Sequence, residues 1–519
     1  MVSTGRSCLT SSWAAFAGHR EDAGLDLPDG VAADAMLARL VDGSHAAFAE
    51  ALADVGNCRR PIRLDGESMT VDRATGEVLG RFSSTDTPLG QLYVPCGNRR
   101  AHVCPACSRT YARDTFELIR AGVAGGKSVP PMVRAVPLVF VTLTAPSFGY
   151  VHGVRPDGGR CRPRRSDTVE TCPHGVRLAC SARHEEDDRL VGGPLCPDCY
   201  DWTGAVIWQW HVPVLWRRTT TALRRELARR LGTTEGRLKG VASLQFAKVA
   251  EYQARGLVHF HALIRLDGPD GPGSPAPLTA DDLADAVRAA TSSTAVPAPP
   301  AWESDLSRVI GWGRQLDARI VTHGGGLAGS ERLEPAQVAG YLAKYATKDS
   351  GLSAENRDRP HLHRLADTCR ELHEHAVRRA EWRRAGLSTV VPLDSQGSDH
   401  YALIGKWAHM LGFRGHFASK SRRYSVTLRA LRRARARFRR LVEQSARSGE
   451  PLDTRDLERR LLAEDDEATT LVVGSWAYAG TGWPRPGDAV LAVAAAARAR
   501  EYAQWKAETT RTAAAHPHR

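Results

Sequence analysis

Residues 256–264, GLVHFHALI, alternate between apolar side chains and histidines with a period of two. In a β-strand successive side chains point to opposite faces, so His259 and His261 share one face, roughly 6–7 Å apart along the chain. The other face, from Val258 to Ile264, is wholly apolar and predicts packing on a core. The strand therefore separates a buried face from a face that carries two imidazoles.

A second strand precedes this one at residues 241–253, VASLQFAKVAEYQ. Only Ala254, Arg255 and Gly256 lie between the two strands. A three-residue hairpin loop favours glycine in the left-handed region at its last position, which is where Gly256 stands. This loop predicts an antiparallel hairpin in which Gln253 pairs with Leu257.

The same register places Glu251 opposite His259 and diagonal to His261. A carboxylate and two imidazoles then meet on one face of the hairpin. With ligand distances of about 2 Å, such a set can hold a divalent metal and leave coordination positions open. The alternative is an amphipathic hairpin whose histidines face water.

Two tyrosines follow on a predicted helix that contains YLAKYATK at residues 341–348. Pro335 suits the first turn of this helix, and Tyr341, Lys344, Tyr345 and Lys348 fall on one stripe. A free tyrosine has a pKa near ~10 and is a poor nucleophile at neutral pH. Neighbouring lysines and a metal that polarises a phosphate would favour the phenolate. The alternative is that both tyrosines are core residues whose hydroxyl groups contact water.

A third motif is LVFVTLTAPSF at residues 138–148, an apolar strand that ends in Thr-Leu-Thr. Together the three motifs resemble the His-hydrophobe-His endonucleases that initiate rolling-circle replication. The sequences RGLVHFHALIRLD and GYLAKYATK are similar to those of the two-tyrosine initiators of plasmids and integrative elements in high-GC Gram-positive bacteria. The resemblance covers roughly residues 55–430.

This resemblance implies an α+β fold, with a small antiparallel sheet that has the His-x-His motif on a central strand beside a tyrosine-bearing helix. It implies metal-dependent transesterification at a replication origin, with Tyr345 as the first nucleophile and Tyr341 as the second. His259, His261 and Glu251 would hold Mg²⁺ or Mn²⁺. The implied partners are origin DNA, single-stranded or supercoiled double-stranded, and a host helicase and polymerase.

The same residues are compatible with two other functions. A two-tyrosine transposase shares the cysteine modules, the His-x-His motif and the tyrosine pair, but transfers DNA ends into a target. A zinc-dependent DNA-binding protein without catalysis would use Tyr341 and Tyr345 only for packing.

The chain has eleven cysteines, and residues 1–20 lack the apolar core of a signal peptide. In a cytoplasmic protein, Cys-x-x-Cys pairs indicate metal sites before disulfides. Two such pairs lie in proline-containing turns, where two thiolates can bind one zinc ion at about 2.3 Å. We therefore predict two structural zinc ions per chain.

The first predicted zinc set comprises Cys58, Cys96, Cys104 and Cys107. The second comprises Cys172, Cys180, Cys196 and Cys199, with Cys161, His174 and His184 as competing ligands. The alternative for all of them is ordinary buried thiols. Cys8 and Cys369 have no evident partner.

The charge balance favours a polyanionic partner. The chain has 71 Lys and Arg against 58 Asp and Glu, a net charge of +13 and a pI near 9.4. Residues 421–440 contain nine arginines and no acidic residue. They predict a helix that contacts DNA phosphates, although a solvated helical face is the alternative. The predicted DNA-binding residues are Arg422, Arg423, Arg429, Arg432 and Arg433.

These observations predict five segments and no membrane association. The longest apolar run near the C-terminus is far too short to span a bilayer, so we expect a cytoplasmic protein. The segments are an N-terminal segment of unknown role (1–54), a cysteine-rich zinc module (55–134), a catalytic domain (135–350) with the second zinc module inserted at 155–203, a basic helical DNA-binding region (351–445) and a C-terminal tail (446–519).

Overall fold

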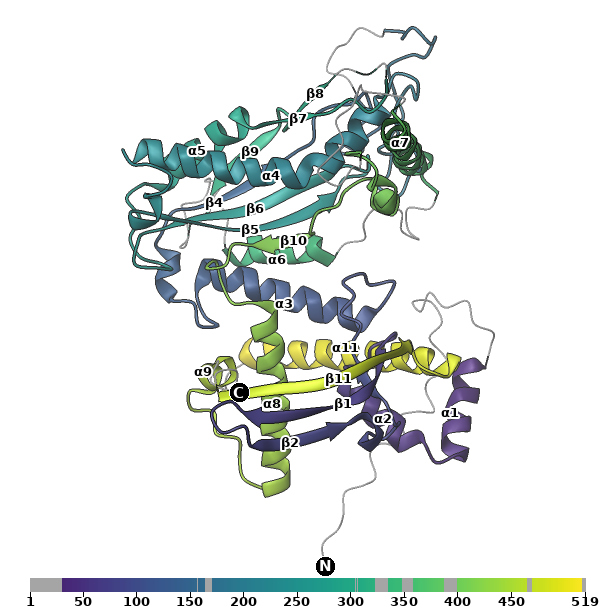
Figure 1. The fold of residues 1–519 in the computed structure, drawn as a ribbon, viewed down its shortest axis with the longest axis vertical. Coiled ribbons are helices and arrows are strands. Elements are labelled where there is room, and N and C mark those ends of the chain that lie inside the picture. The colour runs from purple at the N-terminus through teal and green to yellow at the C-terminus, as the bar shows by residue number, and fades with distance from the viewer. Residues whose placement is uncertain are drawn as a thin grey trace, which may run out of the picture. The chain divides into compact units, whose positions relative to one another are not determined.

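The computed structural model describes residues 30–155, 157–163, 170–303, 305, 307–322, 335–347, 358–386, 399–463 and 469–515. The chain divides into two units (Figure 1). Unit 1 combines Met1–Thr115 with Arg432–Arg519, and unit 2 is Phe116–Leu431. The histidine strand and the tyrosine helix both belong to unit 2.

Unit 2 is built on a five-stranded antiparallel sheet with the histidine strand at its centre. Both histidines lie on β6, the third strand across the sheet. In order across the sheet the strands are β10 (Ala418–Lys420), β5 (Ser243–Tyr252), β6 (Val258–Asp267), β4 (Leu138–Leu143) and β9 (Leu316–Ile320). The fold class is thus α+β with small antiparallel sheets.

The β5–β6 hairpin has the predicted register. The Gln253 amide donates to the Leu257 carbonyl at 2.9 Å, and Glu251 pairs with His259 across the hairpin. Gly256 has a φ of 79°, the left-handed conformation that the three-residue loop requires. Loop length and one glycine were sufficient to predict this pairing.

The two faces of the sheet are covered by different helices (Figure 1). Helices α4 (Trp202–Arg230) and α5 (Ala280–Ser293) cover the apolar face, where Phe260 packs edge-on against Trp216. Helix α6 (Pro335–Thr347) lies against the histidine face. The apolar alternation of β6 therefore predicted its buried face correctly.

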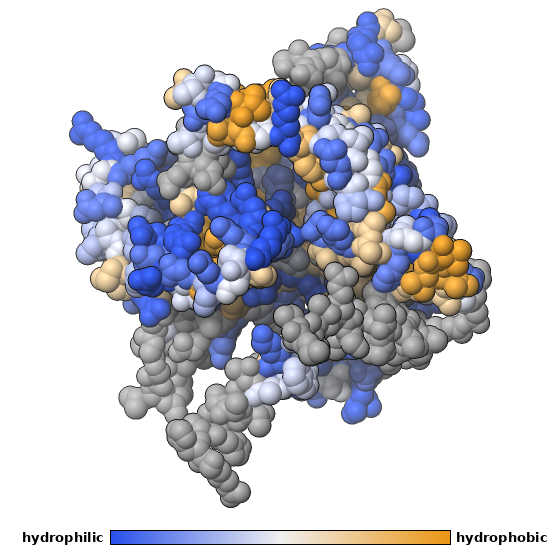
Figure 2. All heavy atoms as spheres, turned by 90° about the horizontal axis from the view of Figure 1, so that it is seen from below, coloured by the Kyte–Doolittle hydropathy of each residue, from blue (hydrophilic) through white to orange (hydrophobic). Residues whose placement is uncertain are grey.

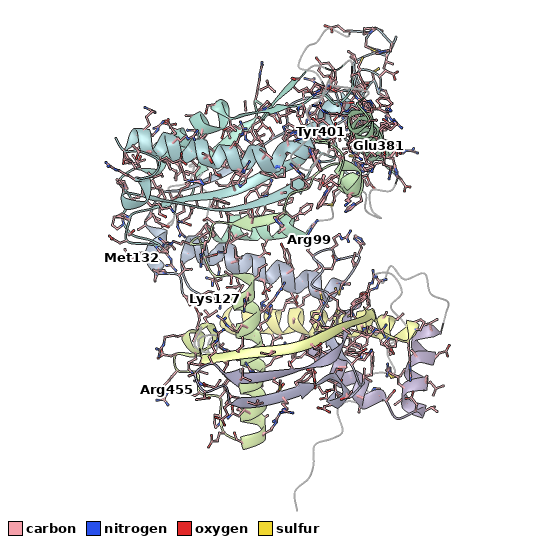
Figure 3. All side chains as sticks on the ribbon, in the orientation of Figure 1. Arg99, Lys127, Met132, Glu381, Tyr401 and Arg455 are labelled. Carbon is pink, nitrogen blue, oxygen red and sulfur yellow. The ribbon has the colours of Figure 1, made fainter. Side chains whose placement is uncertain are left out.

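The main core extends from the apolar face towards α7 (Pro360–Arg384). The fully buried Trp208 donates its indole N–H to the Gly311 carbonyl on β8 (Arg308–Gly311), which pairs with β7 (Ala295–Ala298). Tyr401, labelled in Figure 3, is also fully buried and donates to the Pro299 carbonyl at 2.8 Å. These contacts join α4 and Tyr401 to the β7–β8 pair and the residue that follows β7.

Unit 1 contains a second antiparallel sheet, in which β1 pairs with three other strands. Its strands are β1 (Ile62–Asp72), β2 (Val78–Ser83), β3 (Leu92–Val94) and β11 (Thr470–Thr481). Its helices are α1 (Val31–Val41), α2 (His45–Asp54), α9 (Leu457–Leu462) and α11 (Pro486–Ala515). Along the chain, the division between the units falls within helices α3 (Pro105–Ala124) and α8 (Leu428–Ser448).

The two ends of the chain share one core in unit 1, which differs from the predicted division. Trp483 packs between Phe48 and Tyr93, at ring-centroid distances of 5.0 and 4.9 Å. Arg39 forms a buried ion pair with Asp488, with an Nη2–Oδ2 distance of 2.6 Å. The predicted segments 1–54, 55–134 and 446–519 all contribute to this unit, because β1 pairs with β11 over a sequence separation that no local pattern reveals.

Among the described residues, no helix is long and apolar enough to cross a membrane. Figure 2 shows one face of the molecule, on which hydrophilic side chains predominate and apolar side chains form small separate patches.

Candidate functional site

The His261 ring is held from both sides on the face of the sheet opposite the main core. Its Nε2 atom lies 3.1 Å from Oε2 of Glu251 on β5, and its Nδ1 atom lies 3.1 Å from Oγ1 of Thr142 on β4. Thr142 is the cross-strand partner of His261. The ring is almost fully buried, so these two contacts fix its orientation.

His259 lies two residues earlier on β6 and differs from His261 in its contacts. Its Nε2 atom is buried and has no hydrogen-bond partner among the described residues. Burial, followed by the nearby charges of His261 and Arg255, lowers the pKa of His259 to about 3. The ring is therefore neutral at pH 7, and a neutral imidazole with an unused nitrogen is the form that binds metals.

The donor set partly fits a divalent cation. Two ligands at about 2.1 Å and 90° to each other on an octahedral ion are about 3.0 Å apart, which is close to the 3.1 Å between His261 and Glu251. His259 supplies the third donor from the same face. Within the described part of the chain, however, this triad is not among the groups whose donor atoms all lie within 4.8 Å of one another. His261 and Glu251 are adjacent, and His259 stands further off.

Helix α6 places both predicted tyrosines beside His261. The ring centroids of Tyr341 and Tyr345 lie 5.2 and 5.7 Å from that of His261, and 4.4 Å from each other. The Lys344 ammonium lies 5.9 Å from the centroid of the Tyr345 ring. Lys348 lies outside the described residues. Sequence spacing put the tyrosines on one helical stripe, and the structure turns that stripe towards the histidine strand.

The two tyrosines are not equivalent. Burial, followed by a hydrogen bond with Tyr345, raises the pKa of Tyr341 well above its usual range. Tyr341 is nevertheless 41% exposed, so the residue as a whole remains accessible to solvent. A phenol with a raised pKa is protonated at neutral pH and serves as a hydrogen-bond donor in the resting state.

The first predicted cysteine set forms one group in unit 1. Cys58, Cys96, Cys104 and Cys107 have sulfur atoms that all lie within 4.8 Å of one another. The Sγ atoms of Cys58 and Cys104 are 3.8 Å apart, and the Cys96 amide donates to the Cys58 sulfur at 3.3 Å. Hydrogen bonds from Cys107 and then Cys58 hold the pKa of the Cys104 thiol far below its usual range. The group can hold a metal ion.

The second predicted set divides into two groups in unit 2. Cys180 does not join Cys172, Cys196 and Cys199 as predicted; it lies with two of the competing ligands and with a histidine that the sequence prediction missed. One group is Cys172, His174, Cys196 and Cys199, and the other is His152, Cys161, Cys180 and His184. His152 precedes Cys161 by nine residues, so no short ligand motif identifies it. Cys369 is buried in the core of unit 2, and Cys8 lies outside the described residues.

The arginine-rich run is only partly available for a ligand. It forms a turn and the first half of α8, where Arg435 forms an ion pair with Asp114 and Arg437 donates to the Leu461 carbonyl at 3.1 Å. These two arginines are structural. Of the predicted DNA-binding residues, four are exposed and the last is half-buried: Arg422, Arg423, Arg429, Arg432 and Arg433.

Comparison with known proteins identifies the family. The family described as "Replication initiator protein, pSAM2" matches residues 44–497, which include the histidine strand and the tyrosine helix. A replication initiator protein of Streptomyces ambofaciens is 43% identical over 456 residues, covering 86% of this chain and 89% of that protein. No solved structure matches. The predicted resemblance to replication initiators is confirmed, and the chain belongs to the pSAM2 family of replication initiator proteins.

Proposed function

We propose that this initiator cuts one strand of a plasmid or integrative-element origin by tyrosine transesterification and so starts rolling-circle replication. The observation that carries the proposal is the packing of the Tyr341 and Tyr345 rings against His261, at ring-centroid distances of 5.2 and 5.7 Å. Two nucleophiles beside one candidate metal site suit a reaction that must both cut and rejoin DNA.

In the proposed reaction Tyr345 is the first nucleophile. Its phenol loses a proton and its oxygen attacks the scissile phosphorus, while the bond from phosphorus to the 3′ oxygen breaks. The leaving oxygen gains a proton and becomes the 3′-hydroxyl primer, and the 5′-phosphate stays on Tyr345. Lys344, beside the Tyr345 ring, offsets the negative charge that develops on the phosphoryl group.

A divalent ion, Mg²⁺ or Mn²⁺, would polarise the scissile phosphate when bound by His261, Glu251 and His259. Support for this ligand set is the unpartnered Nε2 atom of His259 and the 3.1 Å separation of His261 and Glu251. Thr142 positions the His261 ring for that role.

Tyr341 is the second nucleophile, which closes the cycle. Burial and a hydrogen bond with Tyr345 raise its pKa, so its phenol is protonated at neutral pH and must lose a proton before it attacks. When replication regenerates the origin, Tyr341 attacks the new junction and the freed 3′-hydroxyl resolves the phosphotyrosine on Tyr345.

Zinc supports the fold in this proposal, and DNA and host proteins are the partners. The Cys58 group and the Cys172 group would each hold one structural zinc ion. The exposed arginines at positions 422, 423, 429 and 432 would contact origin phosphates without reading sequence. A host helicase and polymerase would extend the primer.

Cleavage of a candidate-origin oligonucleotide with Mn²⁺, followed by mass mapping of the peptide on the 5′ end, tests the proposal. Tyr345→Phe should abolish the covalent adduct and leave DNA binding nearly intact, and Tyr341→Phe should cut once but not rejoin. Tyr502→Phe, which changes an exposed tyrosine of α11, is the matched control. An adduct that persists in Tyr345→Phe and disappears in Tyr341→Phe reverses the order, and normal cutting and rejoining in both variants refutes the mechanism.

A further inference from the structure

Between β4 and α4, two sets of four potential metal ligands alternate along the chain. His152 and Cys161 come first, then Cys172 and His174, then Cys180 and His184, and finally Cys196 and Cys199. The first and third pairs form one group, and the second and fourth pairs form the other. We propose that this insertion is a cross-braced module with two zinc ions, and that His152, Cys161, Cys180 and His184 form a separate Cys₂His₂ zinc site.

The distances between the donor atoms match the edges of a zinc tetrahedron. Zn–N distances near 2.05 Å and Zn–S distances near 2.3 Å give N···N and N···S edges of about 3.3 and 3.6 Å. In the His152 group, Nδ1 of His152 lies 3.2 Å from Nε2 of His184, and that nitrogen lies 3.4 Å from the Cys180 sulfur. One Nε2 atom therefore has two neighbours at the separations that a shared ion requires.

A carboxylate orients the central histidine of this site. Nδ1 of His184 lies 2.6 Å from Oδ2 of Asp188, which leaves Nε2 of the same ring facing His152 and Cys180. Zinc-bound histidines commonly donate their other ring N–H to a carboxylate, which fixes the tautomer and strengthens the ligand. The Asp188–His184 pair has this arrangement.

The insertion has almost no apolar core of its own, so something else must hold it together. From residue 151 to residue 199, the described buried residues are four of the eight ligands together with Val191 and two glycines. In the His152 group, Cys161 is 3% and His184 is 7% exposed. Segments of this size usually need metals or disulfides to fold, because they cannot bury enough apolar surface.

The cross-braced order couples the two sites. Each site closes a loop of chain that contains a ligand pair of the other site, so an empty site leaves a longer flexible loop for its neighbour to close. Because metal binding and folding share one free energy in such a module, losing one ion should weaken the other site about tenfold or more. Two zinc sites in series along the chain would not affect each other in this way.

The module lies against the catalytic hairpin, which gives the second site a role. His152 exchanges backbone hydrogen bonds with residues 192 and 193, and a Cβ atom on Gly192 would collide with the Ala254 carbonyl in the β5–β6 turn. Arg359 at the start of α7 donates to the Val191 carbonyl at 2.7 Å. The His152 site therefore fixes a strip of chain that packs on the hairpin carrying Glu251 and His259.

A groove of about 1140 Å³ lies at this junction. Its lining includes residues of the module, from His152 to Val154 and at Gly192, together with Arg255 and Arg314. Arg314 is exposed and makes no hydrogen bond or ion pair within the described residues through its side chain. Under the proposed function, this groove receives the DNA strand next to the cleavage site, so the zinc site shapes a substrate surface.

Metal counting on the purified full-length chain tests the module without reference to nicking. Native mass spectrometry in reducing buffer should find three zinc ions per chain, one in the Cys58 group and two in the insertion. His152→Gln should lose one ion, and a chelator should remove a second ion at about tenfold lower concentration than in the wild type. Cys369→Ala, a cysteine change in unit 2 outside every group, should keep all three ions.

Asp188→Asn keeps all four ligands and provides a milder test in case His152→Gln does not fold. It should retain three ions at saturating zinc but bind one of them about 10–100-fold more weakly. Cobalt substitution distinguishes the groupings, because the proposed insertion has five Co–S bonds on two ions and a Cys172, Cys180, Cys196 and Cys199 site would have four on one. Two zinc ions per chain, unchanged in His152→Gln, would overturn the proposal even if origin cleavage were confirmed.

Discussion

Thr142→Val should weaken the proposed catalytic metal site without removing any of its proposed ligands. The Thr142 hydroxyl lies 3.1 Å from Nδ1 of His261, and Glu251 lies 3.1 Å from Nε2 of the same ring. Valine keeps the shape and β-propensity of threonine at this strand position and removes only the hydroxyl. The His261 ring then loses one of the two contacts that set its orientation and tautomer.

The expected losses of metal affinity and folding stability follow from the position of the contact between Thr142 and His261. Loss of a group that orients a metal-bound histidine typically costs 10–100-fold in metal affinity, or about 1.4–2.7 kcal/mol. The variant also leaves a buried ring nitrogen without a partner, which costs about 1–3 kcal/mol of folding stability. His261 is 3% exposed, so water cannot readily replace the lost hydroxyl.

The assay is single-turnover cleavage of an origin oligonucleotide over a series of Mn²⁺ concentrations. Thr142→Val should shift the half-saturating concentration upwards by 10–100-fold and recover most of the rate at saturating metal. Thr220→Val is the matched control, because the Thr220 hydroxyl bonds only within α4, to the Arg217 carbonyl at 2.8 Å. Equal metal dependence in Thr142→Val and wild type, with a normal fold, would refute the positioning argument.

Three further predictions concern single side chains. Glu251→Gln should lower single-turnover cleavage by a hundredfold or more, since it removes the carboxylate of the proposed metal site, worth about 3 kcal/mol. Burial lowers the pKa of Lys248 from 10.5 to about 7, so its charged form opposes folding by up to about 5 kcal/mol below pH 7, and stability should rise between pH 7 and 10.5. Lys248→Met should raise the melting temperature at pH 6 and remove that pH dependence. The gain is reduced by the loss of the hydrogen bond that Lys248 donates to the His416 carbonyl. Asp488→Asn should lower the free energy of unfolding of unit 1, measured in urea, by about 3–5 kcal/mol, because Arg39 is left buried without its ion-pair partner. Replacing both Arg39 and Asp488 with Leu should lower it much less.

The candidate site was predictable because its signals are local. Period-two alternation identified the two faces of β6, and one glycine at the end of a three-residue loop set the register that pairs Glu251 with His259. Helical spacing put Tyr341 and Tyr345 on one stripe. Each of these inferences depends on residues within about ten positions of one another, where backbone geometry leaves few alternatives.

Thr142 and His152 were missed because their roles depend on contacts between distant segments. Thr142 and His261 are 119 residues apart in the sequence, and the pairing of β4 with β6 brings them together. His152 reaches its group through a stem in which its backbone pairs with residues 192 and 193. A threonine in an apolar strand and a lone histidine after it carry no motif.

The division of the second cysteine set illustrates a general limit. Four cysteines suffice for one tetrahedral site, so the Cys-x-x-Cys pair predicted one ion and treated the nearby histidines as competitors. The structure places Cys199 3.3 Å from His174 and Cys180 3.4 Å from His184. His174 therefore takes the predicted place of Cys180 beside Cys172, Cys196 and Cys199, and Cys180 lies in the other group. Residue types that could bind a metal can thus be read from sequence, whereas their grouping depends on how the chain crosses itself, and in this segment neighbouring pairs along the sequence belong to different groups.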